Sequence, residues 1–135
     1  MSEFRRLLVV AAAIVAPAMC AAGSKPDVEK GKAFFSATCG VCHSVQKTGG
    51  PNQGPNLLGV VGRKAGSQPQ FPGYSAALKA SNIIWSTQSL DKFLLDPMAK
   101  VPGTLMPIQI ADDKTRADVV AYLATLKKDA ADSVR

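Results

Sequence analysis

The 135-residue chain has one histidine, His43, and three cysteines. With a single imidazole, the chain cannot by itself form a site that needs two histidines. Cys20 lies in an N-terminal segment that we expect to be removed, so Cys39 and Cys42 would be the cysteines of the mature chain. These two lie within the same five residues as His43, so no framework of structural disulfides is available.

Aromatic residues are also scarce, at 6% of the chain, whereas turn-forming residues are common, with 9 prolines and 11 glycines. Hydrophobic residues make up 47% of the sequence, and its length suits one domain, because domains commonly run to about 100–150 residues. We therefore expect a single domain with a modest core that is completed by something other than side chains.

Long runs of charge are missing as well. The net charge is +6, but the basic residues are scattered, and the expected mature chain has adjacent basic residues only at Arg63-Lys64 and Lys127-Lys128. A nucleic-acid-binding protein usually gathers such residues on one face or along one helix. We therefore expect no nucleic acid partner, and we attribute the charge to ordinary solubility.

The N-terminus has the three regions of a secretory signal: Arg5 and Arg6, an apolar run over residues 7–19, and then small residues. We predict a signal peptide over residues 1–22 and a functional domain over residues 23–135, which in a bacterium would be exported to the periplasm. The apolar run is shorter than the roughly 20 residues that span a bilayer. The alternatives are an uncleaved signal that anchors the protein to the membrane, and a lipid-modified Cys20.

The rest of the chain favours an all-α fold with long loops. Residues 47–71 are too rich in Gly, Pro, Asn and Gln for either helix or strand periodicity, and Pro and Gly also make residues 101–107 a loop. No segment has convincing strand periodicity. Capping residues and apolar spacing predict helices over residues 27–38, 75–80, 86–96 and 112–128, of which the last is the strongest.

The motif Cys39-Gly-Val-Cys-His43 has three chemical interpretations. A zinc site needs about four ligands, but this motif holds all the cysteine and histidine of the expected mature chain. A dithiol redox site usually begins a helix beside a βαβ pattern, whereas this motif follows a predicted helix and no strand is in sight. Covalent attachment of haem c is the third, and C-x-x-C-H is its signature.

The spacing of the motif suits haem attachment, which we favour. Cys39 and Cys42 share one face of a helical turn, so both sulfurs can form thioethers with the vinyl groups of one porphyrin. His43 can then direct a ring nitrogen at the iron. With no second histidine, the other axial ligand would be a methionine. Met106 is favoured because it lies in a loop bounded by Pro and Gly, and Met98 is the alternative.

Taken together, residues 27–128 resemble a class I cytochrome c of the mitochondrial and bacterial periplasmic type. Beyond the C-x-x-C-H motif, four further parts of the chain support the resemblance. They are Gly31 with Phe35, which face Val119, Tyr122 and Leu123; Gly54-Pro55-Asn56-Leu57; the trio Arg63, Tyr74 and Trp85; and Pro102-Gly103-Thr104-Leu105-Met106.

The resemblance implies a role for each of these residues. Gly31 and Phe35 would cross the last helix, and the carbonyl of Pro55 would accept a hydrogen bond from the axial His43. The polar atoms of Arg63, Tyr74 and Trp85 would reach the haem propionates. The loop that contains Thr104 would present Met106 as the second axial ligand. Each of the aromatic residues could instead be an ordinary core residue.

The chain also departs from the pattern of the family. Phe93 stands where many members have a tyrosine whose hydroxyl contacts the axial sulfur, so we expect that hydrogen bond to be missing. Thr38, Met98 and Leu105 occupy positions that are lysines in mitochondrial-type members, where a basic ring guides docking. We therefore expect electron transfer to depend less on salt than it does in those proteins.

These features predict a soluble periplasmic one-electron carrier, and not an enzyme. With both axial positions filled, the iron gains and loses an electron without binding substrate, and a dry pocket raises its potential. Apolar residues would keep the pocket dry. We expect a monomer whose electron donor and acceptor are membrane or periplasmic redox proteins. The alternative is a haem enzyme or gas sensor, for which a distal acid or base is usual. The residues expected to dry the pocket are Leu57, Phe93, Ile108 and Val119.

Overall fold

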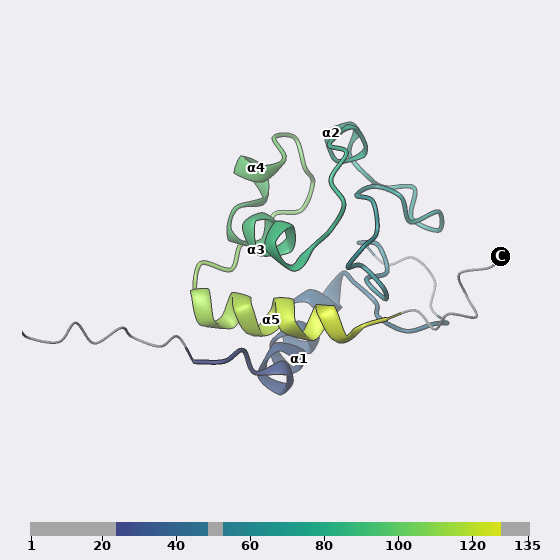
Figure 1. Cartoon of the computed structure of the whole chain (residues 1–135). Helices are drawn as coiled ribbons and strands as arrows, with labels where there is room; N and C mark the ends of the chain where they lie inside the picture. The colour runs from purple at the N-terminus through teal and green to yellow at the C-terminus, as the bar shows by residue number, and fades with distance from the viewer. Residues whose placement is uncertain (1–23, 49–52, 128–135) are drawn as a thin grey trace, which may run out of the picture.

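The computed structural model describes residues 24–48 and 53–127, and this part of the chain is helical, without a β-strand (Figure 1). An isolated antiparallel bridge between Lys64 and Ile84 is its only extended pairing. The expected signal peptide, with Cys20, lies outside the described residues. The elements are α1 (Val28–Ala37), the 3-10 turn η1 (Cys39–Val41), α2 (Ala76–Ala80), α3 (Thr87–Leu95), α4 (Pro97–Lys100) and α5 (Asp113–Thr125).

Helices α1 and α5 cross each other and form the base of the fold, with α3 above α5 in the view of Figure 1. The crossing is close because α1 has Gly31 there: a Cβ atom on Gly31 would collide with the backbone carbonyl of Asp118 in α5. Beside it, the rings of Phe35 and Tyr122 pack with their centroids 5.4 Å apart. The crossing of Gly31 and Phe35 with the last helix, which the resemblance implied, is present.

Side-chain caps determine where the longer helices begin. Asp27 accepts hydrogen bonds from the amides of Glu29 and Lys30 at the start of α1, both at 3.1 Å. Ser86 and Ser89 form a reciprocal capping box at the start of α3. Such caps satisfy amides that have no partner within the helix, and each stabilises the helix by about 1 kcal/mol.

The sequence missed one helix. Pro97 was expected only to end α3, and it does follow that helix, but it also occupies the first position of α4, where a proline is well tolerated. The side chain of Asp96 caps α4 by accepting a hydrogen bond from the amide of Ala99 at 2.9 Å. The pair Asp96-Pro97 is a recognisable start signal, which could have revealed this short helix.

Helix α5 is shorter than the sequence predicted. We expected it to reach about Lys128, but it ends at Thr125, and Lys127 lies beyond its last turn. The reason is a tertiary contact: the carbonyl of Leu126 accepts a hydrogen bond from the amide of Gly59 at 2.7 Å, and Leu126 leaves the helical conformation. The loop that follows the C-x-x-C-H motif is thereby fastened to the end of α5.

The core lies among α1, α3 and α5 and is modest, as expected. Val119 of α5 is completely buried at the centre of a cluster that also includes Trp85 and Phe93, whose rings meet edge-on at 5.1 Å. In the described residues no helix is long and apolar enough to cross a membrane. The other buried apolar residues are Phe35, Val60, Ala65, Leu90, Leu94, Val101, Ile110, Val120, Tyr122 and Leu123.

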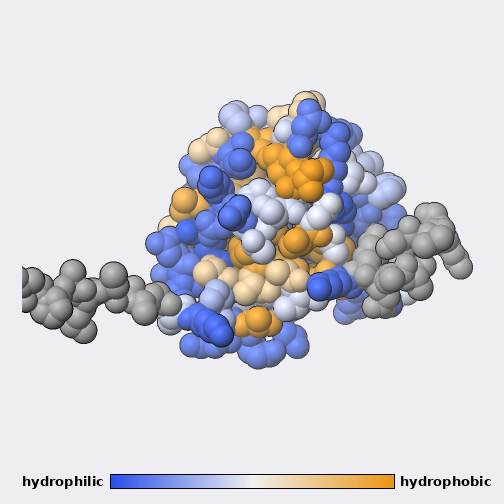
Figure 2. All heavy atoms as spheres, in the orientation of Figure 1, coloured by the Kyte–Doolittle hydropathy of each residue, from blue (hydrophilic) through white to orange (hydrophobic). Residues whose placement is uncertain are grey.

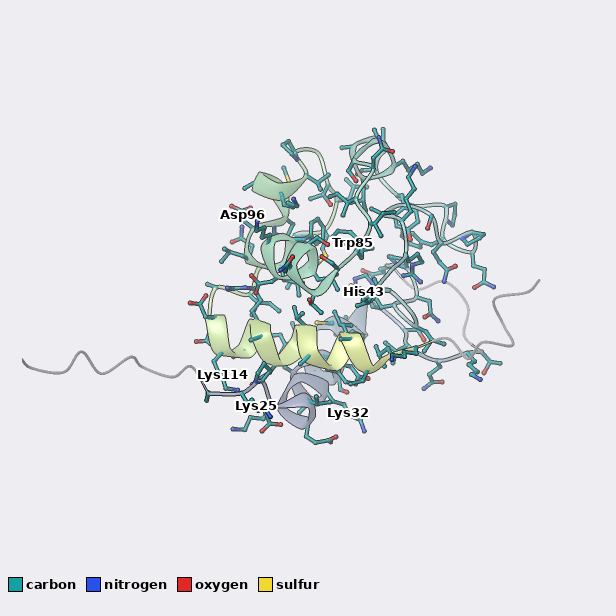
Figure 3. The ribbon with its side chains drawn as sticks, in the orientation of Figure 1. Lys25, Lys32, His43, Trp85, Asp96 and Lys114 are labelled. Atoms are coloured by element: carbon teal, nitrogen blue, oxygen red, sulfur yellow. The ribbon has the colours of Figure 1, made fainter. Side chains whose placement is uncertain are left out.

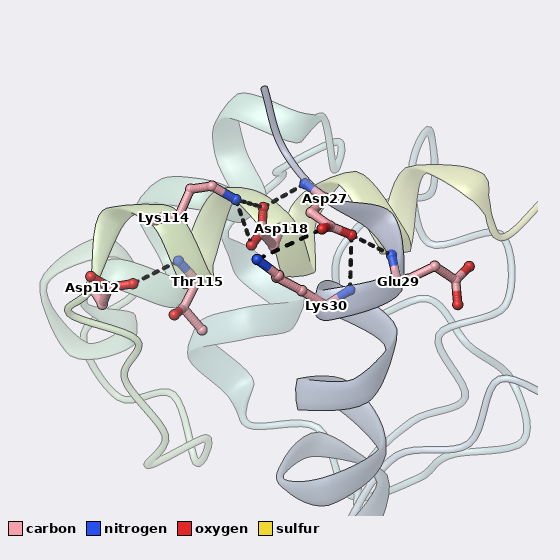
Figure 4. Close-up of polar contacts among 7 residues, drawn as sticks. All are labelled: Asp27, Glu29, Lys30, Asp112, Lys114, Thr115 and Asp118. Atoms are coloured by element: carbon pink, nitrogen blue, oxygen red, sulfur yellow. Dashed lines mark hydrogen bonds and ion pairs between the residues drawn. The ribbon is translucent and has the colours of Figure 1, made fainter. Parts of the chain in front are cut away.

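A buried carboxylate joins the start of α1 to α5 (Figure 4). Asp118 accepts a hydrogen bond from the backbone amide of Asp27 at 2.6 Å and two from Lys114, at 2.5 and 2.7 Å. Its side chain is only 5% exposed. The hydrogen bonds from Lys114 and Asp27 hold the pKa of Asp118 below its ordinary value, so the carboxylate stays ionised and paired.

Candidate functional site

The C-x-x-C-H motif forms a single tight turn directly after α1. The carbonyl of Cys39 accepts hydrogen bonds from the amides of Cys42 and His43, at 3.0 and 2.9 Å. This geometry keeps the two cysteines on one turn, as their spacing predicted. Both thiols are free and half-buried. Burial is the main cause that raises the pKa of Cys39, and the neighbouring Cys42 raises it further, so the thiol stays protonated.

A second loop, Gly54 to Leu57, is fastened along this turn. The amide of Gly54 donates to the carbonyl of Cys42, and the amide of Leu57 donates to the carbonyl of Ser44, both at 2.8 Å. Between these two bonds, Nδ1 of His43 lies 2.8 Å from the carbonyl oxygen of Pro55. The sequence resemblance implied this histidine contact, and the structure contains it.

The contact with Pro55 determines which nitrogen of His43 is available. A carbonyl can only accept a hydrogen bond, so Nδ1 must carry the proton and Nε2 is left unprotonated in the neutral ring. Burial lowers the pKa of His43, while the Pro55 carbonyl opposes that shift. The imidazole is therefore neutral at physiological pH, which is the form that binds a metal.

Residue 54 has to be a glycine because its backbone passes very close to the ring of His43. A Cβ atom at this position would lie 2.5 Å from Cε1 and 2.7 Å from Nδ1 of His43. Real Cβ atoms do not come so close to a ring, so any larger residue would displace either the imidazole or the loop. The glycine thus contributes to the position of His43 without contacting it through a side chain.

Arg63 is half-buried beneath the same loop. Its guanidinium donates to the carbonyls of Asn56 and Leu58, at 2.8 and 3.2 Å, but no carboxylate pairs with it in the described part of the chain. Burial lowers the pKa of Arg63, and the nearby Tyr74 opposes the shift. A desolvated cation without a carboxylate partner favours an anionic ligand close by.

Backbone pairing places Trp85 beside Arg63. The amide of Trp85 donates to the carbonyl of Arg63 at 2.9 Å, and the amide of Gly62 donates to the carbonyl of Trp85 at 2.7 Å. The Trp85 side chain is 8% exposed, and its indole N–H has no hydrogen-bond partner among the residues that the structure describes. In Figure 3, Trp85 is labelled beside α3 and His43 below it, nearer to α5.

Tyr74 completes the trio that the resemblance singled out. Its ring packs edge-on against Phe71 with centroids 5.0 Å apart. Burial raises the pKa of Tyr74, and the backbone of Gln68 and the charge of Arg63 oppose the rise. The structure therefore brings Tyr74 and Arg63 into electrostatic contact, while Trp85 is held beside Arg63 by the backbone.

Met106 lies in the loop between α4 and α5 and is half-buried against the core. The hydroxyl of Thr104, a buried residue, accepts a hydrogen bond from the Met106 amide at 3.4 Å. Met98, the alternative ligand, is 52% exposed on α4. Of the two methionines, Met106 is thus the one whose side chain packs inside the protein.

The four residues expected to keep the pocket dry differ in burial. Phe93 and Val119 are buried and Leu57 packs against the core, whereas Ile108 is 41% exposed in the same loop as Met106. The contribution of Ile108 to the haem pocket stays a prediction. Figure 2 shows apolar surface gathered in the middle of one face, surrounded by hydrophilic residues.

Sequence reasoning also missed a group of polar residues beside the Met106 loop. Arg116 in α5 is 6% exposed, and it donates to the carbonyls of Ile110 and Ala111 and to two carboxylates, Asp91 and Asp113. In the sequence, Arg116 reads as an ordinary helical cation near the acidic residues of the first turn. Only the position of α3 reveals its partner Asp91.

These residues fit a covalently bound haem. Two thiols and a neutral imidazole lie on one turn, the half-buried thioether of Met106 packs against the core from another loop, and Arg63 and Trp85 present polar hydrogens without an anionic partner. A haem supplies two carboxylate side chains for these groups. In the described ranges no three His, Cys, Asp or Glu residues are grouped so that they could hold a metal ion.

Comparison with known proteins agrees with this geometry. The protein-family profile described as Cytochrome c matches residues 28–127, and the chain belongs to this family. Cytochrome c of Euglena viridis is 46% identical over 102 residues, which cover 75% of this chain and 98% of the relative. Cytochrome c2 of Rhodomicrobium vannielii is 43% identical over 121 residues, covering 89% and 94%.

Two solved structures have the same fold. Cytochrome cH from Methylobacterium extorquens is 40% identical, covers 73% of this chain and 98% of its own, and superimposes with a TM-score of 0.66. Cytochrome c2 from Rhodospirillum centenum is 32% identical, covers 76% and 99%, and has a TM-score of 0.70. The chain thus has the small all-α fold of the cytochromes c.

Membership of this family defines the class of protein and its cofactor. The cytochromes c are electron-transfer proteins and not enzymes, and the chain is an electron carrier of this kind. Its cofactor is haem c, and Cys39 and Cys42 fit the C-x-x-C-H motif through which that cofactor is attached. The predictions of fold, cofactor and class from the sequence are therefore confirmed.

Proposed function

We propose that the protein is a soluble, monomeric, periplasmic carrier that shuttles single electrons between larger redox proteins, with His43 and Met106 as the axial ligands of its haem. The hydrogen bond from Nδ1 of His43 to Pro55 is the observation that supports this best. It leaves Nε2 unprotonated as the available ligand atom, on the same turn as the two cysteines that would attach the cofactor.

The surrounding residues act on the cofactor by position and charge. Cys39 and Cys42 attach it, Thr104 orients the Met106 loop through its hydroxyl, and Arg63, Tyr74 and Trp85 present polar hydrogens to its propionates. The haem supplies the one-electron couple of its iron. A neutral thioether ligand and a dry surrounding favour the reduced iron, which raises the potential.

Location in the periplasm is supported by the N-terminal pattern of Arg5-Arg6, an apolar run and small residues, and by bacterial relatives named cytochrome c2 and cytochrome cH. The proposed signal peptide covers residues 1–22. The intact mass of the exported protein tests it: loss of about the first 18–22 residues supports the carrier that is free of the membrane. Retention of these residues would instead support an anchor.

The partners would be membrane or periplasmic redox proteins whose docking surfaces are weakly charged. Met98 and Leu105 are 52% and 75% exposed on the Met106 side of the molecule. Residues 97–111 contain a single charged side chain, Lys100. A surface of this kind has little long-range attraction for a charged partner, so apolar contact would contribute most of the binding.

The central test is the optical spectrum of the reduced protein, produced in cells with haem-attachment machinery, before and after carbon monoxide is added. We expect a c-type spectrum that carbon monoxide leaves unchanged, because both axial positions are filled. Met106→Ala is the positive control, since it should open the iron and bind the gas. If the parent protein also bound carbon monoxide fully, Met106 would not hold the iron, and a ligand-binding or peroxidase function would replace the carrier.

A further inference from the structure

The Met106 loop is held at its two ends. At the first end, the amide of Thr104 donates to the carbonyl of Val101 at 3.0 Å. At the second end, the amide of Ile110 donates to a carbonyl of α3 at 2.8 Å. Within the described structure, residues 105–109 between these ends make one hydrogen bond, from Met106 to the Thr104 hydroxyl. The position of Met106 therefore depends on how firmly the two ends are fixed.

Arg116 fixes the second end. Its Nη1 atom donates to the carbonyl of Ile110 at 2.9 Å and to that of Ala111 at 3.2 Å. Its Nε atom donates to Asp91 of α3 at 2.7 Å, and its Nη2 atom donates to Asp113 at 2.6 Å. One guanidinium thus joins the end of the loop, helix α3 and the start of α5.

The chemistry of this contact is specific to arginine. The Arg116 side chain is 7% exposed, and the hydrogen bonds from the guanidinium, first to Asp113 and then to Asp91, raise its pKa further. It stays charged at every pH at which the protein is folded. A lysine could keep the charge, but it could not donate in the three directions that the planar guanidinium serves.

We propose that Arg116 is a positioning residue for Met106: by fixing Ile110 and Ala111 to α3 and α5, it limits how often the loop moves the thioether away from its ligating position. The proposal rests on the proposed ligation by Met106. In the described residues, the hydrogen-bond partners of Arg116 are Asp91, Asp113, Ile110 and Ala111 and do not include Met106, so we expect its effect to pass through the backbone of residues 107–111.

The test is the affinity of the oxidised holoprotein for added imidazole at neutral pH. Imidazole can bind only when the methionine leaves the iron, so its apparent affinity rises with the fraction of open loop. We expect Arg116→Met to bind imidazole about tenfold more tightly than the parent, which corresponds to about 1.4 kcal/mol. Arg116→Lys should lie between the two.

The matched control is Asp118→Asn, which removes the buried carboxylate of an ion pair in the same helix, on the side that faces α1. It should lower the unfolding temperature while leaving imidazole affinity near the parent value. If Asp118→Asn tightened imidazole binding as much as Arg116→Met, general destabilisation would explain the effect and the proposal would be overturned. An unchanged affinity in Arg116→Met would overturn it as well.

Two measurements keep the test decisive if Arg116→Met fails to fold. Asp91→Asn removes one carboxylate of the cluster at a side chain that is 41% exposed, and it should tighten imidazole binding by about threefold. Hydrogen exchange of the Ile110 amide in the same variant should be faster, while the amides in the middle of α5 keep their rates. Unchanged values of both quantities would refute the positioning role.

The outcome also separates this inference from the proposed function. If the parent protein bound imidazole as tightly as Met106→Ala, the ligand assignment itself would be wrong, and the role of Arg116 would fall with it. If the parent resisted imidazole and Met106→Ala did not, the ligand assignment would stand. The Arg116 variants would then decide the positioning role alone.

Discussion

Nδ1 of His43 lies 2.8 Å from the carbonyl oxygen of Pro55, and two backbone hydrogen bonds on either side fasten the Pro55 loop to the turn that contains His43. One contact thus determines the tautomer of the imidazole and the direction of its other nitrogen. Because a carbonyl acceptor also makes an imidazole a better metal ligand, the loop would tune the proposed axial ligand as well as orient it.

Met106→Ala should lower the reduction potential and let the reduced iron bind carbon monoxide. Axial-ligand identity sets haem potentials over a range of about 0.8 V, so we expect a fall on the order of 100 mV. Potentiometric titration and the carbon monoxide spectrum measure the two effects. Met98→Ala is the control, because Met98 is 52% exposed and should change neither. If Met98→Ala gave the larger change, the two methionines would have to exchange roles.

Gly54→Ala should destabilise the holoprotein and disturb the imidazole. A Cβ atom at Gly54 would lie 2.5 Å from Cε1 of His43, so the ring or the loop must move, at a cost of about 1–3 kcal/mol. Denaturant unfolding measures the cost. Gly40→Ala is the matched control, because its nearest neighbour would be the Phe35 carbonyl at 3.4 Å. Equal stability losses in both variants would show that the approach of Gly54 to His43 has no special importance.

Asp118→Asn should lower the unfolding temperature at neutral pH but not in strong acid. Hydrogen bonds from Lys114 and from the Asp27 amide hold the pKa of Asp118 below its ordinary value of about 3.9. A carboxyl with a lowered pKa stabilises the fold above the unfolded-state value, and the contribution is lost as the pH falls through the folded-state value. The difference between variant and parent should therefore shrink below about pH 4. A difference that stays constant down to the acid transition would contradict this ion pair.

Electron transfer between this protein and its partner should depend weakly on salt. Met98 and Leu105 are exposed at positions where mitochondrial-type members have lysines. The surface around them therefore offers little electrostatic steering to a charged partner. Between about 0.01 and 0.15 M ionic strength, where the screening length falls from about 30 to about 8 Å, we expect the rate to change less than about threefold. Stopped-flow kinetics measures it, and the double substitution Met98→Lys with Leu105→Lys should make the dependence steeper. A steep fall for the parent protein would argue against an apolar docking surface.

Much of the site could be predicted from the sequence because its chemistry is local. The spacing of Cys39, Cys42 and His43 implies one turn, and the turn is present. The resemblance also implied the contact between His43 and Pro55, and the placement of Gly31 against α5. The start of α1 agreed within one residue, since Asp27 caps it as the pattern predicted.

The end of α5 was predicted wrongly because it depends on a distant part of the chain. The end of α5 was placed too late, since nothing near Leu126 in the sequence shows that Gly59 will bond to its carbonyl. Helix α4 was missed for a different reason, because its local start signal, Asp96-Pro97, was interpreted only as the end of α3.

The sequence by itself determined the family and the cofactor, because covalent attachment of a haem requires particular atoms at the fixed short spacing of the C-x-x-C-H motif. The tertiary structure alone decided how the residues of the site are supported. Arg116 lies 25 residues from Asp91, and Asp118 lies 91 residues from the amide that it binds. Such contacts form only when the packing of helices brings together residues that are far apart in the sequence. A buried charge needs a partner because an unpaired one is costly, and the fold decides which residue that partner is.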